Sequence, residues 1–396
     1  MNFFLQYAPR VYTSVVLSIG SALVLFYKAR NVLWKASKKN LSLSGGEIKI
    51  LLIYSKQHFN PSGNSSSHLS FSGTAYWAEY FYELFQKIGN ISYVDYNEVE
   101  LIRTNAGKYN IVAGLSSSGF NLAAKVNPEA YKILIAVNCH PHYRNKIIKQ
   151  ESEYFSKPPT ELLNPFKALK SVSVADKIVL TGNSSVKETY LSHGVNEKDI
   201  ILLAGAADPH RFPSAGHKRQ AIRIVYAGPP TLRKGLFRFL DALSIEKIDT
   251  NPFVLVLYNV SSESEQEEIK LFIKKKKIEI KVEVHQWLDH KQLLDLFHKS
   301  SIAILASHEE GMVFSVLEAI SCGCVPLASR WCGIELPNKN QINDVTDYIE
   351  VMNKLESLVN NIESELKGVH AISAEIISRK RSTQARLDAF IKDLAR

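Results

Sequence analysis

The chain has 396 residues, of which 45% are hydrophobic and 22% are charged, so it is neither an intrinsically disordered nor a fibrous protein. This length exceeds one ordinary hydrophobic core and predicts two domains. The formal net charge of +9 suits phosphorylated ligands or anionic lipid, and no nucleic acid partner is expected because no nucleic-acid-binding module is recognisable.

Residues 11–27 form an uncharged, mostly apolar stretch, and a basic flank follows up to Lys39. As a helix this stretch would be roughly 25 Å long, slightly short of a hydrocarbon core of about 30 Å. The sequence leaves three alternatives open for this stretch. It is an anchor that spans the membrane, a helix that lies in the membrane interface, or a soluble helix that packs on the protein. We predict membrane contact through residues 1–39, and the basic flank predicts the cytoplasmic face of the membrane for the rest of the chain.

After this anchor and linker, residues 1–45, a first α/β domain is predicted at 46–212. Strands are expected at 48–54, 91–96, 109–114, 133–137, 177–183 and 200–203, and helices at 75–88 and 184–193. The connection 55–72 is about three times the usual length of a strand-to-helix loop, and it ends at Gly73. His140 and His142 follow the strand 133–137, at the edge where open α/β sheets bind ligands.

A polar linker at 213–220 opens a second α/β domain, predicted at 213–370. Its strands are expected at 222–227, 253–258, 280–284, 302–306 and 325–328, and long helices at 347–366 and 371–394 end the chain. Arg233 and Lys234 directly precede a predicted helix at 236–243. Two cations at the start of a helix favour an anion site, and the alternative is a pair of exposed charges.

The most informative stretch, 301–329, predicts a strand, a polar turn, a helix over 312–320 and a second strand. Glu310 and Glu318 lie eight residues apart, roughly 12 Å along a helix. That is too far for two carboxylates that share one bond, as in a glycosidase, at roughly 5 to 9.5 Å. They could hold opposite ends of one long ligand. Unsatisfied amide groups of Gly311, Met312 and Val313 favour a polyanion between them, such as a diphosphate that joins two sugars.

This stretch resembles the Glu-x7-Glu signature of retaining, nucleotide-sugar-dependent glycosyltransferases of the GT-B fold, the group 1 type. The resemblance implies two Rossmann-like domains that face a cleft, with the acceptor domain first, the donor domain second and a C-terminal helix, about 371–396, that packs back on the first. It also implies catalytic roles at the donor sugar for Glu310 and His140. The donor-binding residues that it implies are Arg233, Lys234, Gly311, Met312 and Val313 at the diphosphate, Glu318 at the ribose, and Gly73 in the long loop.

The predicted activity is transfer of a sugar from a nucleoside diphosphate sugar to an acceptor hydroxyl, with retained anomeric configuration. A glycan or glycolipid acceptor, such as a lipid-linked or cell-surface glycan precursor, suits the predicted membrane contact. No cofactor or metal is expected, because the chain has no apparent Asp-x-Asp motif and cations would replace a metal. The alternatives are a non-hydrolysing sugar-nucleotide epimerase and a non-catalytic nucleotide-sugar-binding or scaffold protein, since family glycines are absent near Asn259 and Trp287.

Overall fold

The structure is a computed structural model that describes residues 47–56, 73–104, 106–159, 161–214, 222–245 and 253–395. The predicted N-terminal hydrophobic helix and most of the long connection before Gly73 lie outside these described residues. Among the helices that are described, none is long and apolar enough to cross a membrane.

The first half of the chain forms a parallel sheet of six strands in the order β2-β1-β3-β4-β5-β6. Its middle strands are apolar on both faces because helices cover both sides, and alternate residues of each strand enter two separate hydrophobic cores. The strands are β1 (Lys49–Tyr54), β2 (Asn90–Asp95), β3 (Ile111–Leu115), β4 (Tyr131–Ala136), β5 (Lys177–Thr181) and β6 (Ile200–Leu203). The helices are α2 (Gly73–Gln86), α3 (Val99–Thr104), α4 (Ser118–Val126), α5 (Pro141–Phe155), α6 (Pro165–Val174) and α7 (Ser184–Leu191).

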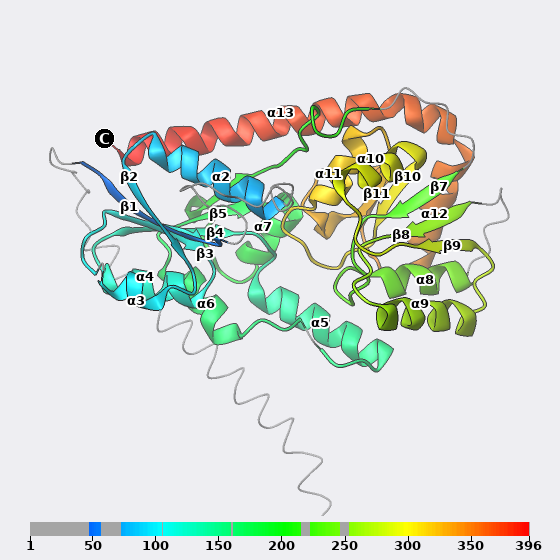
Figure 1. Cartoon of the computed structure of the whole chain (residues 1–396), viewed down its shortest axis with the longest axis horizontal. Helices are drawn as coiled ribbons and strands as arrows, with labels where there is room; N and C mark the ends of the chain where they lie inside the picture. Colours follow the sequence, from blue (N-terminus) through cyan, green and yellow to red (C-terminus); the bar gives the residue numbers. More distant parts are fainter. Residues whose placement is uncertain are drawn as a thin grey trace, which may run out of the picture.

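A second parallel sheet of six strands follows, in the order β12-β11-β10-β7-β8-β9. The two sheets confirm the expected Rossmann-like α/β architecture, and Figure 1 shows them side by side. The strands are β7 (Arg223–Tyr226), β8 (Val254–Leu257), β9 (Lys281–Val284), β10 (Ile302–Leu305), β11 (Val325–Ser329) and β12 (Gln341–Ile342). The helices are α8 (Leu236–Ile245), α9 (Glu263–Lys275), α10 (His290–Lys299), α11 (Phe314–Ser321), α12 (Tyr348–Asn360) and α13 (Ile362–Leu394).

The boundary between the last two helices differs from the sequence prediction. α12 ends at Asn360 and α13 begins at Ile362, so the predicted break between residues 366 and 371 is wrong. Asn361 ends α12 because it leaves the helical conformation and its side-chain amide donates to the Ser357 carbonyl, at 2.9 Å. Gly368 lies inside α13, where a glycine costs only about 1 kcal/mol relative to alanine.

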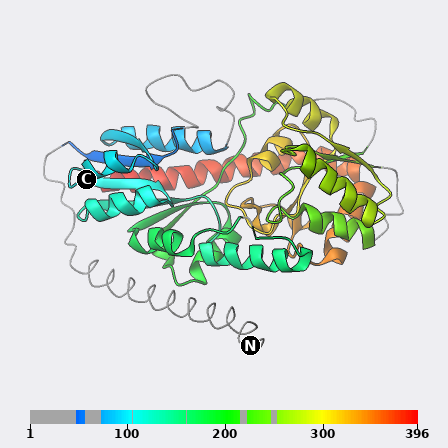
Figure 2. The same cartoon turned by 60° about the horizontal axis from the view of Figure 1, so that its bottom comes forward.

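Helix α13 runs along both sheets (Figures 1 and 2). Its first half buries Val369, Ile372 and Ile376 in the core of the second sheet. Its second half buries Leu387 and Ile391 in the core that the first sheet shares with α2. One continuous helix therefore belongs to both domains and joins them.

We expect Leu387→Ala to lower the free energy of unfolding by roughly 2 to 5 kcal/mol, because the side chain is fully buried and its loss leaves a cavity. Denaturant titration of the full-length chain measures this change. The control is Leu271→Ala, at a position that is 65% exposed, where the change should stay within about 0.5 kcal/mol. Equal effects of the two substitutions would show that α13 does not contribute to the first core as described.

Candidate functional site

The sheet topology places two loops of the second domain together. In the strand order of this sheet, the chain connections run in opposite directions on either side of the β7–β10 pair. Open α/β sheets bind ligands at the carboxyl edge of such a pair of strands. The loop after β7 carries Arg233 and Lys234, and the loop after β10 carries Glu310. Residues that lie about 76 positions apart in the chain therefore meet at one point of the sheet edge.

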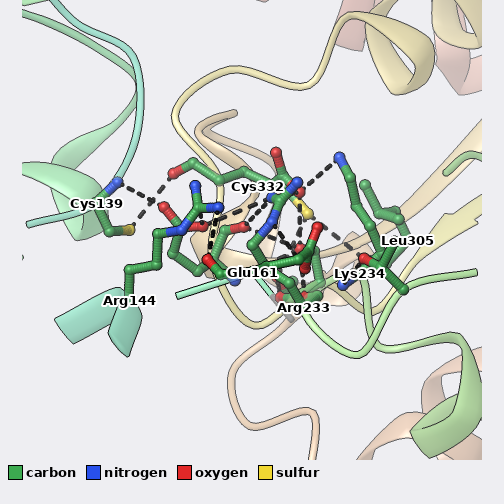
Figure 3. Close-up of polar contacts among 12 residues, drawn as sticks. Cys139, Arg144, Glu161, Arg233, Lys234, Leu305 and Cys332 are labelled. Atoms are coloured by element: carbon green, nitrogen blue, oxygen red, sulfur yellow. Dashed lines mark hydrogen bonds and ion pairs between the residues drawn. The ribbon is translucent and has the colours of Figure 1, made fainter. Parts of the chain in front are cut away.

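Glu310 forms the centre of an ion cluster at this edge, and its two cations, Arg233 and Lys234, are labelled in Figure 3. One carboxylate oxygen, Oε1, lies 2.6 Å from both Lys234 Nζ and Arg233 Nη1, and it accepts a hydrogen bond from Ser307 Oγ at 3.0 Å. Burial by itself raises the pKa of Glu310, but Lys234 and Arg233 outweigh it and hold the pKa below its usual range. The carboxylate is therefore ionised at neutral pH, and three of the predicted site residues lie together.

Arg233 is surrounded by further carboxylates. Its Nη1 lies 3.6 Å from Glu309 Oε2, and its Nε lies 3.6 Å from Oε2 of Glu161, which belongs to the first domain. Burial lowers the pKa of Arg233, but the charges of Glu310, Glu309 and Glu161 more than compensate and raise it. The guanidinium stays charged and is available to an anion that can compete with these carboxylates.

Glu309 is a buried residue of the site that the sequence prediction missed. Its side chain is fully buried, its Oε1 accepts a hydrogen bond from the Cys139 backbone amide at 3.0 Å, and its Oε2 lies 3.8 Å from Arg144 Nη1. Burial raises the pKa of Glu309, and Arg233 and Arg144 only partly oppose this rise. The sequence signal that could have identified Glu309 is its position in a pair of consecutive glutamates, with Glu310, directly after a buried strand. Cys139 and Arg144 come from the first domain, so Glu309 connects the two domains (Figure 3).

Gly311 allows the closest backbone approach between the domains. A Cβ atom at Gly311 would lie 1.8 Å from the Val137 carbonyl oxygen, and a Cβ at Gly333 would lie 1.5 Å from the Gly311 carbonyl oxygen. Helix α11 begins only at Phe314, with Val313 as its N-cap, so the predicted start at Met312 is wrong. Because Gly311 is confined between Val137 and Gly333, the chain turns into the helix two residues later than its periodicity predicts.

Glu318 lies on α11 and is 9% exposed. Burial raises its pKa to about 7. Within the part of the chain that the structure describes, no group hydrogen-bonds to its carboxylate. A buried carboxylate of this kind can accept hydrogen bonds from hydroxyl groups of a ligand.

A cavity of about 300 Å³ lies between the domains and has Glu310 and Lys234 in its wall. The other lining residues of the second domain are Met312, Val313, Phe314 and Ser315, and the first domain contributes Tyr54, Trp77, Leu115, Val137, Asn138 and Thr181. Trp77 is 2% exposed, and its Nε1 has no hydrogen-bond partner among the described residues. The charged groups of the cavity wall thus come from the second domain.

The ring of His140 does not line this cavity. His140 caps the start of α5, its backbone amide donates to Thr189 Oγ1 at 2.9 Å, and its ring stacks on His193 with centroids 4.2 Å apart. Asn138, two residues earlier, lines the cavity instead. The turn into α5 at Pro141 directs the His140 ring against α7, and the sequence alone does not reveal this direction.

Gly73, which the sequence analysis placed in the donor-binding loop, is the first residue of α2.

No metal site stands out in the described ranges, where no three or more His, Cys, Asp or Glu side chains are arranged to hold an ion. The four cysteines are free and buried. Cys332 Sγ lies 3.5 Å from the Leu305 carbonyl oxygen, behind the ion cluster (Figure 3).

Residues 209–378 match the family described as glycosyl transferases group 1. No curated protein matches the chain in sequence. Among solved structures, HepE of Anabaena in complex with UDP-glucose is similar with a TM-score of 0.56 at 11% identity, over 86% of this chain and 100% of that chain. Sucrose-phosphate synthase of Thermosynechococcus elongatus has a TM-score of 0.54 at 14% identity, over 86% and 100%. TarM has a TM-score of 0.54 at 16% identity, over 75% of this chain and 57% of that chain.

The raised pKa of Glu318 predicts a pH-dependent stability. The folded pKa of about 7 lies above the unfolded value of 4.5, so the folded state holds the extra proton and the contribution of Glu318 to stability falls as pH rises from 4.5 through 7. At pH 8 we expect Glu318→Gln to be more stable than the unsubstituted chain by roughly 2 to 4 kcal/mol, since each pKa unit corresponds to about 1.4 kcal/mol.

Denaturant titration at pH 4.5 and pH 8 measures this difference, which should nearly vanish at the lower pH. Glu279→Gln is the control, because Glu279 is an exposed glutamate for which the same substitution should have little effect at either pH. A Glu318→Gln variant with the same pH dependence as the unsubstituted chain would contradict the assigned pKa.

Proposed function

We propose that the chain is a glycosyltransferase of the GT-B fold that transfers a sugar from a nucleoside diphosphate sugar to an acceptor hydroxyl with retention of anomeric configuration, a proposal that the family match and the fold of its structural neighbours support. The observation that carries the proposal is the cluster of Glu310, Lys234 and Arg233 at the carboxyl edge of the second sheet. The acceptor that we propose is a glycan or glycolipid. The spacing of Glu310 and Glu318 supports the retaining mode through the resemblance described above.

Arg233 and Lys234 are the proposed ligands of the donor diphosphate. They lie just before α8, and Lys234 lines the same cavity as Met312 and Val313, so a diphosphate bound there meets the cations and the backbone amide groups that precede α11. As the bond to the sugar breaks, negative charge grows on the leaving diphosphate. Cations that are already in place stabilise this charge without reorganisation, which is commonly the largest contribution to catalysis. We therefore expect transfer to proceed without a divalent metal.

The two glutamates have different proposed roles. A diphosphate that binds Lys234 and Arg233 displaces Glu310 from them, and Glu310 then faces the donor sugar across the cavity. Glu318 accepts hydrogen bonds from the ribose hydroxyls, consistent with a buried carboxylate that no described residue satisfies. Asn138, which lines the cavity, takes the position at the sugar that the sequence predicted for His140.

Substitutions of Lys234, Glu318 and Glu310 test these roles. The measurements are calorimetric binding of UDP and of UDP-glucose, together with single-turnover transfer. Lys234→Ala should weaken both ligands by roughly 1.5 to 3 kcal/mol, the value of a hydrogen bond to a charged group. Glu318→Ala should also weaken both equally, because ribose contacts change little during reaction. Glu310→Ala should leave UDP affinity intact or raise it, since its carboxylate competes for the cations, while turnover falls.

The control is Lys270→Ala, because Lys270 is an exposed residue of α9 outside this site. Weaker UDP binding in Glu310→Ala would contradict the competition between this carboxylate and the diphosphate. Full turnover in both glutamate variants would overturn the proposed mechanism, and UDP-glucose binding without any transfer would favour a non-catalytic binding protein.

Membrane attachment at the cytoplasmic face remains a proposal from residues 1–39, which lie outside the described residues. Deletion of residues 1–39 should move the chain from the membrane fraction to the soluble fraction while UDP-glucose binding persists, because the donor cluster lies elsewhere in the chain. Fractionation of the full-length chain and of the deletion variant measures this. A full-length chain that is found in the soluble fraction would contradict the attachment.

A further inference from the structure

A second cavity adjoins the first one inside the amino-terminal domain. It has a volume of about 420 Å³ and lies between α4 and α6, at the carboxyl ends of β3 and β4. Small-molecule sites typically measure about 300 to 1,000 Å³. This cavity shares Leu115, Val137 and Asn138 with the cavity that contains Glu310 and Lys234. The two cavities therefore adjoin at one wall, which these three residues form.

The chemistry of its lining points to an amphiphilic ligand. Ala136, Ala168 and Val172 contribute apolar side chains, while the hydroxyl groups of Ser116 and Ser118 lie at the entrance, where α4 begins. Among the described residues that line the cavity, none is acidic and Lys167 is the one cation. Such a site accepts an apolar body with a neutral or anionic polar end, and it disfavours a cationic ligand.

Asn138 lies where the cavities meet and has an unused side chain. Its backbone carbonyl accepts a hydrogen bond from Tyr190 OH at 3.1 Å, but no described residue bonds to its side-chain amide. A carboxamide can both donate to and accept from a hydroxyl group. Asn138 is therefore placed to hold an acceptor hydroxyl on the side of the wall that faces Glu310.

Apolar side chains continue from the cavity to the surface. Leu162 and Phe166, on either side of the lining residues Leu163 and Asn164 in the sequence, are 37% and 49% exposed. Helices α3, α4 and α6 lie side by side here (Figure 1), and Leu101 of α3 is 43% exposed. An acceptor with a long apolar part would find apolar contacts outside the cavity as well as inside it.

We propose that this cavity is the acceptor subsite and holds the apolar part of an amphiphilic acceptor whose hydroxyl group reaches Asn138. The inference rests on the proposed function and adds the cavity in which the acceptor binds and the amphiphilic character that this cavity requires. In the reaction, the hydroxyl oxygen forms a bond to the anomeric carbon, and the bond from that carbon to the diphosphate oxygen breaks. The hydroxyl proton passes to the departing diphosphate, so the products are a glycoside and a nucleoside diphosphate.

The test measures binding of two probes to the full-length chain by calorimetry, in the presence of UDP. The probes are n-octyl β-glucoside, below its micelle-forming concentration, and methyl β-glucoside, which has the same sugar hydroxyls. If the cavity buries only about two methylene groups of the octyl chain, the Kd of the octyl compound should already be roughly tenfold lower than that of the methyl compound. Equal Kd values for the two probes would overturn the proposal.

A cavity-filling variant locates the binding. Val172→Phe should abolish the advantage of the octyl compound, because the added ring occupies the apolar part of the cavity. The control is Val282→Phe, which fills a separate groove of about 550 Å³ between α9 and β9 and should preserve the advantage. Retention of the advantage in Val172→Phe, or its loss only in Val282→Phe, would show that the octyl chain binds elsewhere and would also overturn the proposal.

UDP-glucose binding in the same samples separates this inference from the proposed function. It should be unchanged in Val172→Phe, which also shows that the variant is folded; if that variant does not fold, Val172→Leu adds less volume at the same position. A chain that binds no nucleotide sugar would overturn the proposed function, while the comparison of the two glucosides would still decide whether the cavity takes an apolar group.

Discussion

The pairing of two mostly buried cations, Arg233 and Lys234, is the constraint on which the arrangement of both domains depends. A buried charge without a partner costs several kcal/mol, so carboxylates must reach these cations from the surrounding loops. Glu310 does so from the loop after β10, and Glu161 does so from the first domain. Because the partners come from different domains, neutralising the cations brings the carboxyl edges of the two sheets together.

Other contacts hold the domains in this relation. Glu309 accepts a hydrogen bond from the Cys139 amide. Helix α5 extends towards the second domain (Figure 1), and its Glu151 accepts hydrogen bonds from Arg238 Nε at 2.8 Å and Nη2 at 3.0 Å. Helix α13 packs in the cores of both sheets. The cavity that both domains line exists only in this arrangement, which suits the proposed transfer because an activated sugar must be protected from water.

Much of the fold could be predicted because the strands are local features. Each parallel strand is a short apolar run that helices cover on both sides, and such runs are visible in the sequence. Helices α3 to α6 and α10 were not predicted, since only part of each is buried and all but α5 have ten residues or fewer. For α10 a signal existed, because Asp289 and Gln292 form a capping box. The predicted break between residues 366 and 371 contains Gly368, but only packing decides whether a glycine interrupts a helix.

The sequence by itself determined that the chain has an α/β architecture and that Arg233, Lys234 and Glu310 follow buried strands, because strand periodicity and loop composition are local. Only the tertiary structure decided that these residues form one cluster, that Glu309 bonds to Cys139 across 170 positions, and that Asn138 rather than His140 faces the cavity. The physical reason is that the direction of a side chain and the partner of a buried charge depend on segments far away in the chain, about which local periodicity carries no information.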